Sequence, residues 1–253
     1  MDGKEDIKVK SLEKAILVIE CFLSGSELGV TEISDKLGYC KSTVFNILST
    51  FRAMGYLEKN PETEKYRLGV RFCDFSRAVG ENFSIKKISA PYMQELANQV
   101  NERVYLGVPL KDEVLYLESM YPVDEPAMMK SLMGYRAKMY CTGLGKAMMA
   151  FLPEQDIDAA LAEPLEAFTE NTITDPKLLR QNLMGVRSCG YAIDNMEHEF
   201  GVKCVAMPVF GRGHSLAGAV SISGPSLRFS KERIESMLVY LKVCTEKIQN
   251  RLP

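Results

Sequence analysis

Four polar side chains gather where a helix is predicted to begin, near the start of the chain. They are Lys41, Ser42, Thr43 and Asn46. Small and polar side chains at a helix start allow the backbone to approach the major groove of DNA, where side chains reach base edges and phosphates. Lys41 and Ser42 suit phosphate oxygens, whereas Thr43 and Asn46 suit base edges, since asparagine can pair with adenine through two hydrogen bonds. The alternative is an ordinary solvated helix face.

The distribution of charge around these residues favours the first interpretation. The whole chain carries a formal charge of -2, but residues 36–71 contain seven cations against three carboxylates, a local charge of +4. Two of the cations, Lys65 and Arg67, alternate with apolar residues and are predicted to point outward from a strand. Such a basic segment suits phosphate contact, so Lys65, Arg67 and Thr31, at the start of an earlier helix, complete the expected DNA-binding set.

A second set of residues, in the C-terminal half, has the chemistry of an anion-binding site. Gly143 and Gly145 lie in a turn before a predicted helix, where open N–H groups and the positive helix end would receive a carboxylate. Ser221 and Ser223 are two apart on a predicted strand, so both hydroxyls can donate to one ligand. Asp194 would accept from a hydroxyl or hydrate. The plainer explanations are that the glycines only form a tight turn and that the serines bond to neighbouring backbone.

The cysteines and histidines give little support to metal or nucleophilic chemistry. Seven cysteines without a CxxC pair argue against both a disulfide framework and a thiolate zinc site. With only two histidines, a mixed site around Glu197 and His198 is the metal arrangement left open. Cys204 has no plausible base beside it, so an enzyme that uses Cys204 or Asp194 to turn over a small acid is the weaker alternative. We therefore expect no catalytic residue, no metal and no cofactor.

The predicted DNA contacts require a helix-turn-helix, and residues 31–57 have its pattern. Apolar residues repeat at helical spacing on both sides of Gly38, where a short turn lets the second helix cross the first. Thr31 is expected to cap the first of these helices. The second is expected to begin within residues 40–42 and to end at Met54.

A scaffold helix and a hairpin are predicted on either side of this motif. The scaffold helix, capped by Ser11, would bury a face made of Leu12, Ala15, Ile16, Ile19, Phe22 and Leu23. Residues 56–59 and 65–68 are predicted to pair across an Asn-Pro turn, with Tyr66 and Leu68 directed inward. The pattern therefore predicts a winged helix-turn-helix.

A linker and a second domain are expected after the hairpin. Residues 72–79 carry a narrow apolar stripe on a short helix, which fits either a domain linker or a dimer seam. From about Ser84 helices and strands alternate, beginning with a helix whose first turn holds Pro91. Hairpin strands, later strands and a closing helix capped by Ser230 predict an antiparallel sheet with helices packed on it, an α+β fold.

The composition is that of an ordinary soluble protein with enough apolar material for two domains or a single large one. The chain has 253 residues, of which 46% are hydrophobic. Its longest apolar runs are far shorter than the roughly 20 residues of a membrane span, and its first residues include charges but no apolar signal core. We therefore expect a cytoplasmic protein without a membrane partner.

Nearly the whole chain resembles the IclR family of bacterial transcription regulators. SLEKAILVIECF, TEISDKLGYCKSTVFNILSTFRAMGYL and YRLGVRF carry the first part of the resemblance, and TGLGKAMMAFL, GYAIDNMEHEFGVKCVAMPVF and AVSISGP carry the more specific part. The resemblance implies a winged helix-turn-helix domain over residues 7–71, a linker helix over 72–86 and a GAF-like effector-binding domain over 87–253. It also implies a homodimer or homotetramer that binds double-stranded operator DNA and a small, often acidic metabolite.

The resemblance further implies a set of effector-binding residues. They are Leu132, Met133, Gly143, Leu144, Asp194, Cys204, Ser221 and Ser223. Many relatives have arginine at the position of Asn46, so the operator sequence of this chain stays open. We expect a repressor or activator in which effector binding shifts the arrangement of the winged domains, with coupling through residues 72–82 and the oligomer interface. A regulator whose pocket is filled by its own side chains is the milder alternative.

Overall fold

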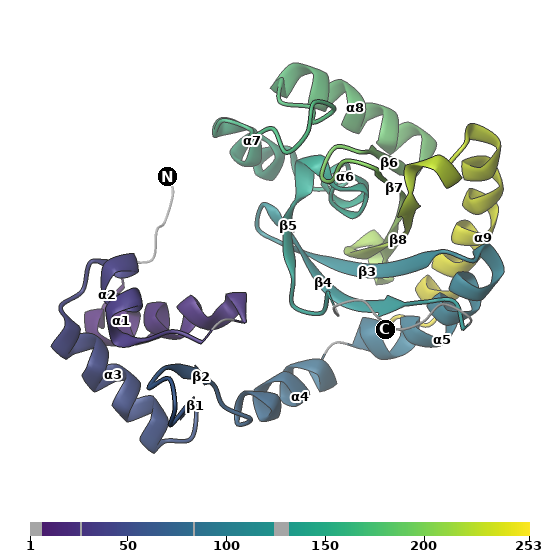
Figure 1. Cartoon of the computed structure of the whole chain (residues 1–253). Helices are drawn as coiled ribbons and strands as arrows, with labels where there is room; N and C mark the ends of the chain where they lie inside the picture. Colours follow the sequence, from purple (N-terminus) through teal and green to yellow (C-terminus); the bar gives the residue numbers. More distant parts are fainter. Residues whose placement is uncertain (1–6, 26, 83, 124–131) are drawn as a thin grey trace. The chain divides into compact units, whose positions relative to one another are not determined.

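The computed structural model describes residues 7–25, 27–82, 84–123 and 132–253 (Figure 1). The chain divides into two compact units, Met1–Asn82 and Phe83–Pro253, and each has its own buried core. The division falls inside the expected linker segment 72–86. Its first part therefore belongs to the helix that ends the first unit, and its last residues open a helix of the second.

The first unit is a winged helix-turn-helix, as predicted. Its elements are α1 (Lys10–Glu20), η1 (Cys21–Ser24), α2 (Val30–Leu37), α3 (Lys41–Ala53), β1 (Leu57–Lys59), β2 (Tyr66–Leu68) and α4 (Phe72–Asn82). Val18 of α1, Ile33 of α2, and Val44 and Leu48 of α3 have no exposed surface and form the centre of the core. β1 and β2 pair as an antiparallel hairpin, and Tyr66 of β2 completes this core.

The buried side of α1 differs from the expected one. Ser11 lies inside the helix and is not its N-cap residue. Leu12 and Ile16 are 59% and 48% exposed, and Leu23 of η1 is 72% exposed, whereas Val18 is buried. The segment is apolar on several sides, so periodicity alone could not choose among them, and only its C-terminal part meets the core.

Glycine rather than threonine caps α2. Gly29 is the N-cap residue and its N–H donates to Glu32 Oε2 at 2.7 Å, while Thr31 lies exposed in the first turn. A carboxylate in the first turn satisfies this N–H and lies favourably at the positive helix end. Because α2 begins at Val30, Thr31 lies inside the helix and is not its N-cap residue. Gly38 and Gly55, after α2 and α3, have φ of +67° and +79°, a conformation that glycine adopts without strain.

Aromatic rings hold the hairpin and α4 together. Tyr56 packs on Phe72 and Phe75, with ring centroids 5.3 Å and 5.9 Å apart. Phe75 keeps 51% of its surface exposed, and the side chain of Val79 lies outside the described residues, so the stripe on α4 fits a linker and a dimer seam alike. Leu68, expected to point inward, is 36% exposed, because it is the last residue of a three-residue strand.

The second unit is an antiparallel sheet between two helical layers, the predicted α+β fold. Its elements are α5 (Ser84–Val100), β3 (Arg103–Leu110), β4 (Glu113–Met120), β5 (Arg136–Lys138), η2 (Met139–Cys141), α6 (Gly143–Met149), α7 (Glu154–Ala162), α8 (Pro176–Cys189), β6 (Ala192–Asn195), β7 (Val202–Phe210), η3 (Arg212–His214), β8 (Leu216–Pro225), η4 (Ser226–Arg228) and α9 (Lys231–Gln249). The strand order is β5-β4-β3-β8-β7-β6, and all neighbours are antiparallel. Figure 1 shows α5 and α9 on one face, with α6, α7 and α8 on the other.

Alternation along the central strands divides their side chains between the two helical layers. Val104 and Leu106 of β3 pack with α5 and α9, whereas Tyr105, between them, packs on the side of α6. On β8, Ile222 joins the α5 and α9 core, so its neighbour Ser221 faces the α6 side. The predicted polar site residues therefore lie on the α6 face of the sheet.

Two helix boundaries in this unit differ from the prediction. α5 begins at Ser84, so Pro91 lies in its middle rather than in its first turn. Ile85 and Met93, on either side of the proline, are buried, and this packing offsets the backbone hydrogen bond that proline removes. α6 ends at Met149, before Leu152 and Pro153, where the sequence predicts its end. Among the described residues, no helix is long and apolar enough to cross a membrane.

Candidate nucleic-acid interface and ligand pocket

The outward face of α3 carries three of the seven predicted DNA-binding residues. Lys41, Ser42 and Asn46 are exposed, and the opposite face of the helix is buried in the core, which fixes this orientation. Phe45, 52% exposed, shares the face with Ser42 and Asn46 at helical spacing. Phe45 is absent from the predicted set, although a phenyl ring here can contact a thymine methyl group. The signal that could have found Phe45 was its position outside the apolar periodicity of the helix.

Thr43 is turned toward the residue that precedes the helix. Thr43 Oγ1 and Cys40 Sγ lie 2.9 Å apart, and Ser42 Oγ donates to the same sulfur at 3.6 Å. These hydrogen bonds, that of Thr43 first, lower the pKa of the exposed Cys40 thiol to about 7. Thr43 is half-buried, and its hydroxyl contacts a cysteine outside the predicted set.

The predicted cations of the hairpin are held in ion pairs. Lys65 Nζ lies 2.8 Å from Glu32 Oε1, and Arg67 Nη2 lies 2.9 Å from Glu58 Oε2. The hydrogen bond from Lys65 is the main reason that the pKa of Glu32 falls below its usual value. Lys41 has no such carboxylate partner among the residues that the structure describes. The positive charge counted in the sequence is therefore partly balanced inside this unit.

A cavity of about 580 Å³ lies on the α6 face of the sheet of the second unit. It is lined by seven of the eight predicted effector-binding residues, namely Leu132, Gly143, Leu144, Asp194, Cys204, Ser221 and Ser223. Met133 lies elsewhere: its side chain is 52% exposed and its Sδ is 3.3 Å from Lys86 Nζ. Residues from α6, β6, β7 and β8 thus meet in one cavity although they are far apart in the chain.

The cavity also has walls that were not predicted. They include Arg103, Tyr105, Tyr116, Tyr121, Tyr135, Thr142, His198 and Glu199. The ring centroid of Tyr116 is 5.9 Å from those of Tyr105 and Tyr135. Burial raises the pKa of Tyr105 to about 12 and raises that of Tyr116 further, so both stay neutral hydroxyls. The alternation of Arg103 and Tyr105 on one strand face was the signal that could have found them.

Direct strand pairing places four polar residues in one row across the sheet. Asp194 of β6 pairs with Cys204 of β7, Cys204 with Ser223 of β8, and Ser223 with Arg103 of β3. Cys204 Sγ donates to Ser223 Oγ at 3.0 Å. Burial raises the pKa of the Cys204 thiol, so it is not the thiolate that a nucleophile requires. The row runs from a carboxyl group to a guanidinium group, with neutral groups between them.

The two glycines at the start of α6 differ in role. Thr142 caps the helix, and its Oγ1 accepts from Gly145 N at 3.1 Å, so the Gly145 N–H is not open to a ligand as expected. A Cβ on Gly145 would lie 2.1 Å from the carbonyl oxygen of Met139, which makes this a close-packing glycine. Gly143 borders the cavity, and among the described residues no acceptor contacts its N–H or that of Leu144.

Behind the cavity wall, a buried ion pair joins α6 to the connection after β6. Lys146 and Glu197 are 1% and 4% exposed, and Lys146 Nζ donates to Glu197 Oε1. Glu197 Oε1 also accepts from Asn195 N at 3.3 Å, and Glu197 N donates to Asp194 Oδ1 at 2.7 Å. The pair therefore helps to orient Asp194. For the open metal site at Glu197 and His198, no group of three or more suitable ligands occurs within the described ranges.

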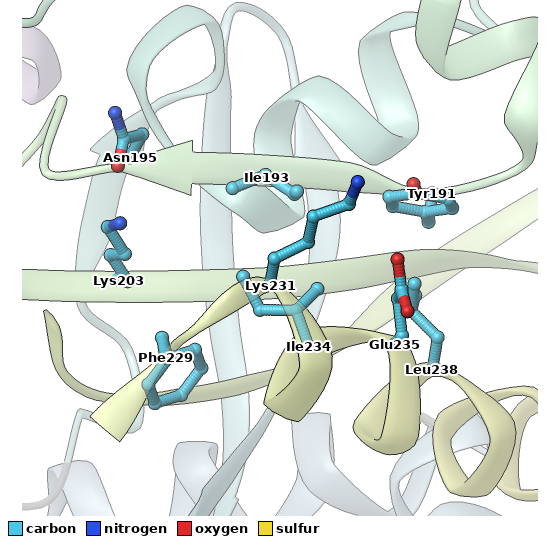
Figure 2. A pocket seen from close by; sticks show the side chains of 9 residues that line it. All are labelled: Tyr191, Ile193, Asn195, Lys203, Phe229, Lys231, Ile234, Glu235 and Leu238. Atoms are coloured by element: carbon cyan, nitrogen blue, oxygen red, sulfur yellow. The ribbon is translucent and has the colours of Figure 1, made fainter. Parts of the chain in front are cut away.

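A second cavity, of about 430 Å³, lies between β6, β7 and α9 (Figure 2). Tyr191, Ile193 and Asn195 line it, and these residues alternate with Asp194, so this is the opposite face of the sheet. Figure 2 shows Lys231 extending between Ile193 and Tyr191. None of the predicted effector-binding residues lines this cavity. The first cavity is therefore the candidate ligand site.

The carboxyl group of Asp194 makes stability depend on pH. Burial raises its pKa to about 6, from a usual value of 3.8. Because the folded-state pKa is the higher one, the folded state loses stability as pH rises through the window between these values. We predict that Asp194→Asn raises the free energy of unfolding by about 2–3 kcal/mol at pH 8 and by little at pH 4. Urea unfolding at both pH values measures this, and an equal gain at both would exclude charge as the cause.

Both units match models of known protein domains. The model of the IclR helix-turn-helix domain matches residues 11–61, and the model of the bacterial transcriptional regulator IclR C-terminal domain matches residues 77–250. The chain belongs to the IclR family. This DNA-binding regulator family accounts for the winged unit, and the cavity lies in the part of the chain that matches the C-terminal model.

Individual IclR relatives align along most of the chain. The transcriptional regulator KdgR of Escherichia coli K12 is 31% identical over 253 residues, 98% of this chain and 95% of the relative. BhcR of Paracoccus denitrificans is 32% identical and covers 93% and 85%. The solved Thermotoga maritima IclR matches with a TM-score of 0.75, 28% identity and coverage of 96% and 98%. An IclR homologue from Microbacterium hydrocarbonoxydans, complexed with 4-hydroxybenzoate, has the same fold, with a TM-score of 0.81, 21% identity and coverage of 95% and 98%. The curated relatives are transcriptional regulators, not enzymes.

Proposed function

We propose that this regulator binds a small organic acid in the cavity of its second unit and thereby changes its affinity for double-stranded operator DNA. The observation that carries the proposal is the convergence of Asp194, Ser221, Ser223 and the Gly143 amide on one cavity of about 580 Å³. This volume lies within the ~300–1,000 Å³ range of small-molecule sites. The relative complexed with 4-hydroxybenzoate supports an acid as the ligand class.

The proposed DNA contacts are of two kinds. We expect Lys41, Ser42 and Thr31 to contact phosphates. Asn46 and Thr43 are expected to contact bases, and Thr43 would have to exchange its contact with Cys40 for one with DNA. The hairpin cations at positions 65 and 67 reach phosphates only by exchanging their glutamate partners for them. Contacts from α3 are therefore expected to carry the sequence specificity. The hairpin cations add phosphate contacts only by losing their ion pairs with glutamate.

Salt dependence of operator binding tests the phosphate contacts. Lys41→Ala is expected to reduce the slope of log K against log salt by about 0.9, the counter-ion release of one phosphate contact, and to weaken binding severalfold. Arg67→Ala is expected to reduce it by less, because Arg67 already has a carboxylate partner. Fluorescence anisotropy at several salt concentrations measures both slopes. Lys177→Ala, on α8 of the other unit, is the control, and an unchanged slope for Lys41→Ala would remove the assignment.

The regulator is proposed to act as a homodimer or a dimer of dimers. Leu12 and Ile16 on α1, and Phe75 on α4, leave about half or more of their surface exposed, and a second copy can cover apolar side chains of this kind. Two winged units in a symmetric dimer would contact two half-sites of a pseudo-palindromic operator. The ligand acts by population shift, so it changes DNA affinity only as far as it prefers one arrangement of the units.

A thermal-shift screen tests the sensing function directly. We predict that an acid from a panel of pyruvate, glyoxylate, sugar acids and aromatic acids raises the melting temperature, because a ligand that binds only the folded state stabilises it by mass action. Ser221→Ala is expected to reduce that shift, and the same compound must change operator affinity. If no compound does both, the sensing function loses its support, and a regulator without an effector, the milder alternative, is favoured.

A further inference from the structure

The second cavity lies where the sheet extends beyond the helix that covers it. α9 packs on β7 and β8, and side chains of these strands on the α9 face, such as Val205 and Ile222, are fully buried. β6 is the edge strand, and Ile193, which pairs with Val205 and shares its face, is only half-buried, as is Ile234 of α9. An apolar strip between the edge strand and the helix therefore stays accessible, and the cavity of about 430 Å³ lies along it (Figure 2).

Polar side chains replace the apolar ones at one end of this strip. Val205 and Val209 of β7 are buried against α9, but Lys203, which precedes them on the same strand face, is a half-buried cation. Asn195 of β6 pairs directly with Lys203, so their side chains are neighbours on this face. Figure 2 shows Lys231, the first residue of α9, extending across the apolar strip. The cavity therefore offers two ammonium groups and an amide beside an apolar surface.

The two lysines of the cavity are not held by acidic side chains. Within the part of the chain that the structure describes, no ion pair joins Lys203 or Lys231 to a carboxylate. Glu235, one helical turn after Lys231, is the acidic residue of the lining, and Figure 2 shows it toward the end of the view opposite Lys203. Two ammonium groups against one carboxylate leave the lining with a charge of +1. The cavity therefore favours an anion near Lys203.

An acid with an apolar body matches both parts of the lining. Its carboxylate would accept charge-assisted hydrogen bonds from the two ammonium groups and a further hydrogen bond from the Asn195 amide. Its apolar body would cover Ile193 and Ile234 and remove their exposed surface from water. An inorganic anion gains only the first contribution, and a neutral apolar molecule gains only the second. The volume of the cavity lies within the ~300–1,000 Å³ range of small-molecule sites.

We propose that the second cavity is a binding site for an amphipathic monocarboxylate, separate from the cavity on the α6 face and independent of the proposed sensing function. The two cavities lie on opposite faces of the same strands. Asp194 of β6 and Cys204 of β7 face the first cavity, whereas Ile193 and Lys203, their neighbours along these strands, face the second. One chain therefore has room for two ligands, one on each side of β6 and β7.

Titration of the full-length chain, followed by NMR of its isoleucine and leucine methyl groups, tests the second site. Ile193 and Ile234 report on the second cavity, and Leu144 reports on the cavity of the α6 face. The probes are phenylacetate, its neutral counterpart phenylacetamide, and inorganic phosphate. Phenylacetate is expected to shift the signals of the two isoleucines saturably and to bind there about 10-fold more tightly than phenylacetamide or phosphate.

Charge variants of the lining separate the contribution of the carboxylate from that of the apolar body. Lys203→Met and Lys231→Met are each expected to weaken phenylacetate binding by about 3- to 10-fold and to leave phenylacetamide unchanged. Glu235→Gln is expected to tighten phenylacetate binding severalfold, because it removes a like charge from the lining. Lys242→Met is the matched control, since it removes one positive charge from the same helix outside the cavity and should change nothing. An unaltered Leu144 signal shows that each variant is folded.

Several results would overturn the second site. They are equal affinity for acid and amide, unchanged affinity in both lysine variants, the same loss in Lys242→Met, and no saturable shift of the two isoleucines. Phenylacetate that shifts Leu144 alone would place the acid on the α6 face, which supports the sensing function and removes this site. Isoleucine signals that change with protein concentration, and not with the acid, would assign the cavity to contact with a second copy of the chain.

Discussion

Replacement of Lys146 by methionine is expected to lower the free energy of unfolding of the second unit by about 3–5 kcal/mol. Lys146 is 1% exposed and donates to Glu197, which is also buried. Without the lysine, the glutamate charge has no compensating cation, and Glu197 Oε2 already has no hydrogen-bond partner among the described residues. Urea unfolding followed by far-UV circular dichroism measures the loss, since the chain contains no tryptophan.

Two control variants separate charge from packing in this experiment. The double variant Lys146→Met with Glu197→Gln removes both charges and is expected to recover most of the lost stability. Lys138→Met breaks an exposed pair with Asp112 in the same unit, where Nζ and Oδ2 are 2.6 Å apart, and should cost at most about 1 kcal/mol. A double variant as unstable as the single one would attribute the loss to packing.

Gly145→Ala is expected to destabilise the same unit by roughly 3 kcal/mol, at the upper end of the range for overpacking. The new Cβ would meet the Met139 carbonyl oxygen at 2.1 Å and the Met139 Cα at 2.3 Å, so backbone rather than a flexible side chain must move. α6 would have to shift away from η2, and with it the Gly143 wall of the cavity. Ligand-induced stabilisation should therefore fall together with the free energy of unfolding.

Gly185→Ala is the matched control for this substitution. Gly185 lies inside α8, and no atom lies within 4 Å of a Cβ placed on it. Alanine favours the helix over glycine, so this variant is expected to gain about 0.5–1 kcal/mol. A small and equal effect of both substitutions would show that the contact between α6 and Met139 adjusts easily, contrary to the prediction.

Sequence patterns predicted the elements best where the signal was local. Ser230 was predicted to cap the closing helix α9, and its Oγ accepts from Arg233 N at 3.2 Å, because a helix cap needs no distant partner. The buried face of α1 was predicted poorly, since its apolar residues surround the helix and only tertiary packing selects Val18. The Thr31 cap was wrong because α2 begins one residue earlier, at Val30, with Gly29 as its N-cap residue.

The residues of the candidate site were likewise predicted where the signal was local in the sequence and missed where it was not. The family motifs include residues of α6, β6, β7 and β8, so six predicted residues from these elements could be placed in one cavity. Arg103 lies outside those motifs, and its pairing with Ser223 of β8 joins strands far apart in the chain, which one sequence does not reveal. Lys146 was missed for a related reason. A lysine in an otherwise small and apolar helix implies a buried partner, but Glu197 is 51 positions away.

The ion pairs of the hairpin bear on how quickly the regulator finds its operator. Proteins bind non-specific DNA mainly through phosphate contacts that release counter-ions. The strength of this binding sets the time spent at each non-specific site. Lys65 and Arg67 already have Glu32 and Glu58 as internal counter-ions, so a collision with random sequence releases few others. In the proposed complex the regulator therefore leaves wrong sites early and samples more of the genome per unit time. It is expected to stay only where the base contacts proposed for α3 offset the loss of the ion pairs with glutamate.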